Sequence, residues 1–159
     1  MLFLGMLSLL SFTLVNAQNI PAVKITEVVK LYSNSSDSTY VINFWATFCK
    51  PCIAELPHLQ SISTKYKNDK VKLVLVSLDL ASFYPKQIAS FAKQHGVLAD
   101  VLWLNETDAD YFCTLIDQQW SGAIPATLIV RPATGYKKFF EAELTAEEFE
   151  RELQLALGK

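Results

Sequence analysis

The spacing of apolar residues changes several times along the chain and predicts an alternating series of strands and helices. Runs rich in β-branched and aromatic residues, bounded by polar turns, are typical of strands. Such runs occur at 40–45, 71–78, 101–104, 127–130 and 136–140. Helical spacing between capping residues predicts helices. Three helices are expected at 25–31, 49–66 and 85–95. A fourth is expected to begin at a capping residue within 105–108 and to end near 116, and a fifth to begin at a capping box at 145.

The order of these elements predicts the fold class. Strands alternate with helices until the last two strands, which a short turn at 132–135 joins as a hairpin. The run at 71–78 is apolar enough for a strand that is buried on both faces. The pattern therefore predicts a single three-layer α/β domain, in which helices flank a central mixed sheet.

The first residues form a different kind of segment. Residues 2–15 are almost wholly apolar, yet they are fewer than the roughly 20 that a membrane-spanning helix needs. Small or aliphatic residues follow at 15–17, so we expect a signal peptide at 1–17 and a domain at 18–159. No Lys or Arg precedes the apolar run, which leaves a buried N-terminal element or an uncleaved membrane anchor as alternatives. A signal peptide implies export, to the periplasm if the source is bacterial.

Composition narrows the classes of function. Hydrophobic residues make up 51% and charged residues 19%, which excludes a disordered chain and a coiled coil. The net charge of −2 argues against a nucleic-acid partner held by bulk charge, since such binding needs a basic excess. Three cysteines are too few for a disulfide scaffold, and the odd number leaves at least one unpaired.

The chemistry is expected at Cys49 and Cys52, which follow an apolar strand and open a helix. Two cysteines three apart on a first helical turn can bring their sulfur atoms within bonding distance. The partial positive charge of a helix N-terminus stabilises a thiolate. Cys49 lies at the mouth and is the expected nucleophile, and Cys52 can resolve a mixed disulfide by attacking it. Lys50 adds a nearby positive charge, and Pro51 suits an early helical position.

The surrounding residues argue against most other uses of a CxxC motif. A zinc site would need a second CxxC or a His pair, and neither is present. Haem attachment would need His where the chain has Ile53. A peroxiredoxin would have Thr and Pro at the positions of Ala46 and Ile42. A purely structural disulfide stays open as an alternative. The chain has no Gly-rich loop for a flavin or nicotinamide, so neither a metal nor a cofactor is expected.

The stretch at 41–52 resembles the thioredoxin superfamily, and within it the exported oxidoreductases of the TlpA/ResA group. Their typical core reads NFWATWCxPCxxExP, which this chain matches through Glu55 and Pro57 and departs from at Phe48. The resemblance implies a thioredoxin-like fold and exchange of thiols and disulfides with protein partners. It also implies a cis-proline loop at Ile124-Pro125 that faces the dithiol, where Ile124 pairs with an extended substrate segment. An ordinary loop proline is the alternative.

The resemblance also assigns roles to neighbouring residues. Asn43 stands where cytosolic thioredoxins carry a buried Asp that assists proton transfer, which Asn cannot do. Glu55, one turn beyond Cys52 on an apolar stripe, can replace that acid, because burial raises its pKa. The alternative is a boundary Glu bonded to backbone or solvent, with Pro57 spoiling the geometry. Trp45 is expected beside the dithiol as a shield, or simply in the core.

Three other features have plainer interpretations. Cys113 falls on an apolar helical face and is expected to pack in the core. His58 is expected at the surface. The acidic run at 141–152 is expected to be a solvated helix face.

The resulting hypothesis is an exported oxidoreductase that reduces disulfides in protein substrates through the Cys49/Cys52 dithiol. It would need re-reduction, for which a membrane thiol donor is expected. Two alternatives remain, a disulfide oxidase or isomerase and a non-catalytic binding module with a structural disulfide. The sequence indicates neither the substrate protein nor the oligomeric state.

Overall fold

The computed structural model describes residues 19–159. The predicted signal peptide at 1–17 lies outside these residues, so the structure does not test it. Within the described part, no helix combines the length and the apolar character needed to cross a membrane.

The elements follow the predicted order closely. The strands are β1 (Ala22–Val23), β2 (Thr39–Trp45), β3 (Val71–Ser77), β4 (Asp100–Leu104), β5 (Ala126–Arg131) and β6 (Tyr136–Phe140). The helices are α1 (Ile25–Leu31), α2 (Lys50–Lys65), α3 (Lys86–Gln94), α4 (Ala109–Ile116) and α5 (Ala146–Leu157), with single 3₁₀ turns at η1 (Lys67–Asp69) and η2 (Pro132–Thr134). Sequence patterning missed β1, because two residues cannot show a strand period.

The strands form one sheet in the order β1-β4-β3-β2-β5-β6. The pairs β1–β4, β3–β4 and β2–β3 are parallel. The pairs β2–β5 and β5–β6 are antiparallel. The predicted mixed sheet and C-terminal hairpin are therefore confirmed. Because β2 and β3 run parallel, the loops that follow them leave the sheet at the same edge.

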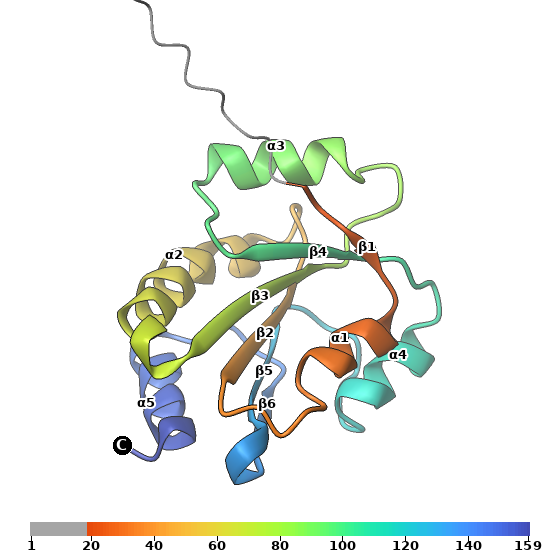
Figure 1. The fold of residues 1–159 in the computed structure, drawn as a ribbon. Helices are drawn as coiled ribbons and strands as arrows, with labels where there is room; N and C mark the ends of the chain where they lie inside the picture. The colour runs from red at the N-terminus through yellow and green to blue at the C-terminus, as the bar shows by residue number, and fades with distance from the viewer. Residues whose placement is uncertain (1–18) are drawn as a thin grey trace, which may run out of the picture.

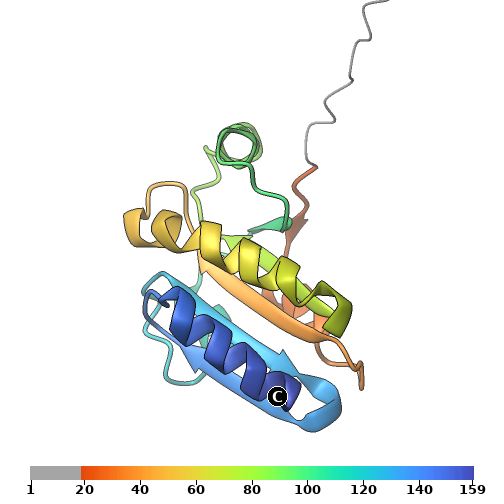
Figure 2. The ribbon, with the colours of Figure 1, turned by 90° about the vertical axis from the view of Figure 1, so that its left-hand side faces the viewer.

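Helices cover both faces of the sheet, as predicted (Figure 1). α2 and α5 lie side by side over one face (Figure 2), and α3 shares their apolar cluster. α1 and α4 pack over the other face. Side chains of β2 point to the two faces of the sheet in turn and belong to the apolar cluster on each face. Val41 and Trp45 pack on the side of α2, whereas Ile42 and Phe44 pack on the side of α4.

Capping residues explain where α4 and α5 begin and where α3 ends. Asp108 accepts a hydrogen bond from the backbone N–H of Tyr111 at 3.1 Å, which fixes the start of α4. Thr145 and Glu148 form the predicted capping box of α5. Gly96 follows α3 with a φ of 61°, a conformation that favours glycine.

Candidate active site

Cys49 and Cys52 form a disulfide at the N-terminus of α2, with their Cα atoms 5.3 Å apart. Cys49 is the N-cap residue, and its Sγ accepts a hydrogen bond from the backbone N–H of Cys52 at 3.3 Å. This N–H is one of those at the start of a helix that have no intrahelical partner. A negative charge on Cys49 Sγ would be stabilised by this N–H and by the positive end of the helix.

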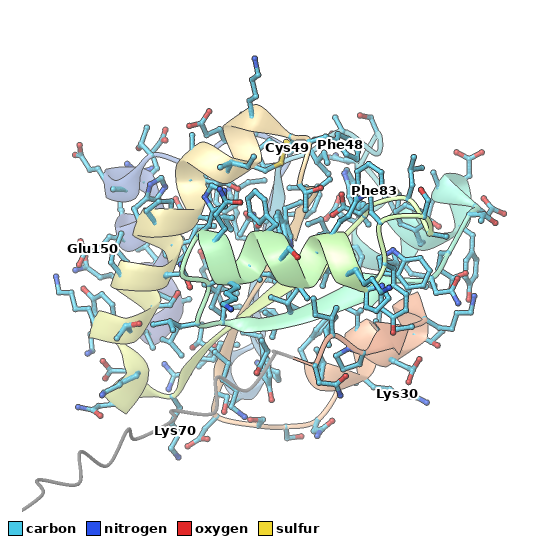
Figure 3. The ribbon with its side chains drawn as sticks, turned by 90° about the horizontal axis from the view of Figure 1, so that it is seen from above. Lys30, Phe48, Cys49, Lys70, Phe83 and Glu150 are labelled. Atoms are coloured by element: carbon cyan, nitrogen blue, oxygen red, sulfur yellow. A yellow bond between two sulfur atoms is a disulfide. The ribbon has the colours of Figure 1, made fainter. Side chains whose placement is uncertain are left out.

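The two sulfur positions differ in access. Cys49 is 8% exposed and Cys52 is fully buried. Lys50 and Pro51 occupy the first two positions of α2 and are exposed. Figure 3 shows Cys49 and Phe48 at one end of the molecule, opposite Lys70. Phe48 is 60% exposed, so an apolar ring flanks the one accessible sulfur.

The loop before β5 faces this sulfur. The Ile124–Pro125 peptide bond is cis, the conformation that the resemblance implies. The carbonyl oxygen of Ile124 lies 3.8 Å from Cys49 Sγ. Pro125 is buried and Ile124 is half-buried. Among the described residues, the backbone N–H of Ile124 has no hydrogen-bond partner. The loop thus offers one free backbone donor beside the disulfide.

Glu141 braces the same loop, which sequence reasoning missed. Its Oε1 accepts hydrogen bonds from the backbone N–H groups of Ser121 and Ala123, both at 3.0 Å, and from the Ser121 hydroxyl. These donors hold the pKa of Glu141 below its usual range, the Ser121 hydroxyl foremost. The expectation of a solvated helix face is wrong here, because Glu141 precedes α5. Glu150 lies on α5 and is partly exposed, and its Oε1 accepts the Tyr66 hydroxyl at 2.8 Å.

Glu55 lies on α2 one turn beyond Cys52 and is completely buried. Its Oε1 accepts a hydrogen bond from Asn43 Nδ2 at 2.7 Å, and its Oε2 accepts one from the backbone N–H of Leu144 at 3.0 Å. Asn43 also donates to Thr127 Oγ1 on the adjacent strand at 2.9 Å. Glu55 is therefore joined to both β2 and the segment before α5.

Burial raises the pKa of Glu55 from 4.5 to about 7, and the hydrogen bonds from Leu144 and Asn43 offset only part of this effect. A carboxyl group with that pKa can both hold and release a proton near neutral pH. The alternative of a backbone-bonded Glu is right about the bond to Leu144 but wrong about a boundary position. α2 continues through the exposed Pro57.

Trp45 is fully buried at the end of β2 and shares an apolar cluster with both cysteines. Its ring centroid lies 5.2 Å from that of Phe91 on α3. Its indole Nε1 has no hydrogen-bond partner within residues 19–159. Trp45 therefore lies in the core, in the apolar cluster that includes both cysteines.

The position of Cys113 agrees with the expectation from the sequence, and the position of His58 does not. Cys113 is 3% exposed in the core, as expected, and burial raises the pKa of its thiol to about 11. His58 is half-buried, with its Nε2 2.7 Å from the Leu144 carbonyl oxygen, so the expected surface position is wrong. Residues 19–159 contain no cluster of three His, Cys, Asp or Glu side chains that could hold a metal ion.

Curated proteins with similar sequences include a thiol-disulfide oxidoreductase and a thioredoxin-like protein. The chain is 28% identical to the thiol-disulfide oxidoreductase ResA of Oceanobacillus iheyensis over 115 residues, which are 69% of this chain and 53% of that protein. It is 28% identical to the thioredoxin-like protein YneN of Bacillus subtilis over 116 residues, 72% of this chain and 63% of that protein. The chain thus spans between half and two thirds of these curated relatives.

Solved structures show the same fold. A thioredoxin-related protein from Neisseria meningitidis superposes with a TM-score of 0.66 at 24% identity, covering 78% of this chain and 88% of that one. StoA from Bacillus subtilis superposes with a TM-score of 0.55 at 24% identity, covering 76% and 85%. The predicted thioredoxin-like fold is therefore confirmed. Since the AhpC/TSA family matches residues 10–135, most of the sequence, the chain belongs to the AhpC/TSA family.

Proposed function

We propose that this protein is an exported thiol-disulfide oxidoreductase that reduces disulfides in protein substrates through Cys49 and Cys52. The observation that carries the proposal is the juxtaposition at one end of α2. There a disulfide-bonded cysteine pair caps the helix, the Ile124 carbonyl lies 3.8 Å from the outer sulfur, and the buried Glu55 lies one turn behind. Relatives that are named thiol-disulfide oxidoreductases support the same reaction.

The first step uses the reduced protein. The Cys49 thiolate attacks one sulfur of the substrate disulfide, forms a mixed disulfide, and releases the other substrate sulfur as a thiolate that takes up a proton. The N–H of Cys52 and the positive end of α2 stabilise the attacking thiolate. The partial exposure of Cys49 makes it the sulfur that a protein substrate can reach.

The second step returns the protein to the disulfide form. Glu55 accepts the proton of the Cys52 thiol, and the Cys52 thiolate attacks Cys49 Sγ. The second substrate sulfur leaves as a thiolate and is protonated. The substrate gains two electrons, which the Cys49–Cys52 pair loses, and two protons, of which one comes from the Cys52 thiol through Glu55 and the other from solvent. A pKa of about 7 suits Glu55 to this exchange.

Recognition of the substrate relies on backbone and apolar contacts. The free N–H of Ile124, beside the cis Pro125, can pair with an extended segment of the substrate. The exposed Lys50 and Pro51 border the same opening. Trp45 closes the dithiol from the core side and limits access of water to Cys52.

The reducing direction requires a source of electrons. We propose that a membrane-bound thiol donor outside the cytoplasm re-reduces the Cys49–Cys52 disulfide, and that the protein reaches this compartment by its N-terminal segment. In the periplasm of a bacterium, the same pair would act against a compartment that is kept oxidising.

Redox titration of the protein against glutathione and dithiothreitol tests the proposal, with Cys49→Ser as control. We expect a reversible two-electron couple near roughly −270 mV, as in thioredoxin. A value near roughly −120 mV would indicate an oxidase and reverse the direction. Absence of a reversible couple would make the disulfide structural and favour the binding module.

A further inference from the structure

Asp79 is a buried carboxylate that bonds the segment leading to Cys49 and that the reaction above does not use. It follows β3 and is only 4% exposed. Its Oδ1 and Oδ2 each accept the backbone N–H of Thr47 at 3.1 Å, and Oδ1 also accepts the Thr47 hydroxyl at 2.6 Å. The Ser77 hydroxyl donates to Oδ2 at 2.7 Å. Both carboxylate oxygens are therefore engaged, mainly by one residue.

Thr47 lies two residues before Cys49, on the short segment between β2 and α2. Consecutive Cα atoms are about 3.8 Å apart, so the Cα atom of Cys49 lies within about 8 Å of that of Thr47. The Cys49 N–H in turn donates to the Ala46 carbonyl at 3.0 Å, which closes a tight turn around Thr47. A bond that fixes Thr47 therefore fixes the position from which Cys49 caps α2.

Asp79 is itself held from two other sides. Its backbone N–H donates to Ser77 Oγ at 3.1 Å, and its carbonyl accepts the indole N–H of Trp103 at 2.8 Å. Leu78 N–H donates to the Trp45 carbonyl at 2.8 Å, which extends the β2–β3 pairing beyond both strands. The carboxylate is thus anchored in the rigid sheet and transfers that rigidity to the segment that carries Cys49.

We propose that Asp79 is a positioning residue for Cys49, because it locks Thr47 so that the Cys49 sulfur meets the N–H groups at the start of α2. The proposal deepens the proposed function and rests on it for its role in turnover. Its chemical consequence is independent of turnover. A Cys49 thiolate that leaves the cap position loses the stabilisation given by the helix N-terminus and reacts as a more basic thiol.

Charge and position can be separated with two substitutions. Asp79→Asn and Asp79→Ala both remove the negative charge, but Asn keeps an acceptor for the Thr47 N–H and Ala keeps none. The charged residues next to the cysteine pair on α2, Lys50 and Glu55, stay unchanged in both variants. A difference between the Asn and Ala variants therefore reports loss of the side chain that bonds Thr47, and not loss of the charge.

The experiment measures the rate at which iodoacetamide alkylates Cys49 in the reduced full-length protein as a function of pH, followed by mass spectrometry of the Cys49 peptide. We expect the midpoint pH of the Ala variant to lie about one unit above that of the Asn variant, a tenfold difference in thiolate at a given pH. Thr47→Val should move the midpoint in the same direction, and Thr47→Ser should keep the wild-type profile.

Asp100→Asn is the matched control, since Asp100 is an exposed carboxylate at the start of β4, where it pairs with Val74 in the middle of β3. It should leave the profile unchanged. If Asp79→Ala and Asp79→Asn share one midpoint, Asp79 does not position Cys49, whatever their melting temperatures. If Asp79→Ala fails to fold, Asp79→Leu replaces it, since Leu is close to Asn in volume and has no acceptor, and equal midpoints for Asp79→Leu and Asp79→Asn then overturn the inference. A missing redox couple in the wild type would refute the proposed function and leave the alkylation result standing.

Discussion

The two faces of the central sheet each bury cysteine in a different chemical setting. On the face of α2, Cys49 and Cys52 lie at a helix N-terminus, and Cys49 reaches the surface. On the face of α4, Cys113 lies in the middle of that helix. Its Sγ is so close to Gly122 that a Cβ atom added at Gly122 would lie 3.7 Å from it. Burial raises the pKa of the Cys113 thiol to about 11. The comparison shows that helix position and access, rather than residue type, determine which thiol can react.

Two glutamates, Glu55 and Glu141, show in the same way that the surroundings of a carboxyl group determine its pKa. Glu55 accepts the backbone N–H of Leu144, on the segment before α5, and Glu141 accepts those of Ser121 and Ala123, on the loop that carries Ile124. Burial dominates at Glu55 and raises its pKa, whereas hydrogen bonds dominate at the more exposed Glu141 and lower its pKa. Similar contacts thus accompany a raised pKa in one carboxyl group and a lowered pKa in the other, because the two differ in burial.

The largest expected difference between the cysteines of the two faces is in the rate of disulfide reduction. Cys49→Ser should lower disulfide reduction by at least about 10³-fold, because it removes the nucleophile. Cys113→Ala should change the rate by less than about twofold, because Cys113 contributes only packing. Steady-state reduction of a disulfide-containing protein by both variants measures this difference. Comparable losses in the two variants would mean that the cysteines of both faces take part in the reaction.

Thiol accessibility gives the second test. At pH 8, a thiol with a pKa near 11 is ionised in only about one molecule in a thousand. We expect Cys113 of the oxidised native protein to react with iodoacetamide at least about 10²-fold more slowly than in denaturant. Labelling followed by mass spectrometry checks this expectation. Fast native labelling at Cys113 would show that α4 opens readily.

Glu55 makes stability depend on pH. Its pKa is raised in the folded state, so the folded protein binds more protons than the unfolded chain between about pH 4.5 and pH 7. The buried carboxylate therefore lowers stability as pH rises through this window. Relative to Glu55→Gln, the wild type should lose roughly 2–3 kcal/mol of unfolding free energy between pH 5 and pH 8. Urea unfolding of the oxidised proteins at both pH values measures it, and parallel curves would contradict the buried, ionising carboxyl.

Glu141→Gln is expected to have the smallest effect. The substitution weakens bonds to Ser121 and Ala123 and loosens the loop that carries Ile124. The KM for a protein substrate should rise about three- to tenfold, the value of about one net hydrogen bond. The alkylation rate of reduced Cys49 should stay unchanged, because α2 is untouched. A slower Cys49 reaction would show that the loop also supports the nucleophile.

Much of the fold could be predicted because its signals are local. The helix at 25–31 and the capping box at Thr145 matched the structure at their starts, since capping and periodicity depend on neighbouring residues. The two-residue β1 gave no signal. The position of His58 was missed because its partner, the Leu144 carbonyl, is 86 residues away in the chain.

The sequence by itself determined the order of strands and helices, the cysteine pair at the start of α2, and the apolar stripe that carries Glu55. Only the tertiary structure decided what surrounds them. Trp45 pairs with Ser77 in the parallel register of β2 and β3, and this register brings Thr47 against Asp79, each two residues further on. Glu141 reaches its loop by the same kind of long-range pairing. The physical reason is that strand register and loop packing depend on contacts between distant segments, which local periodicity does not encode.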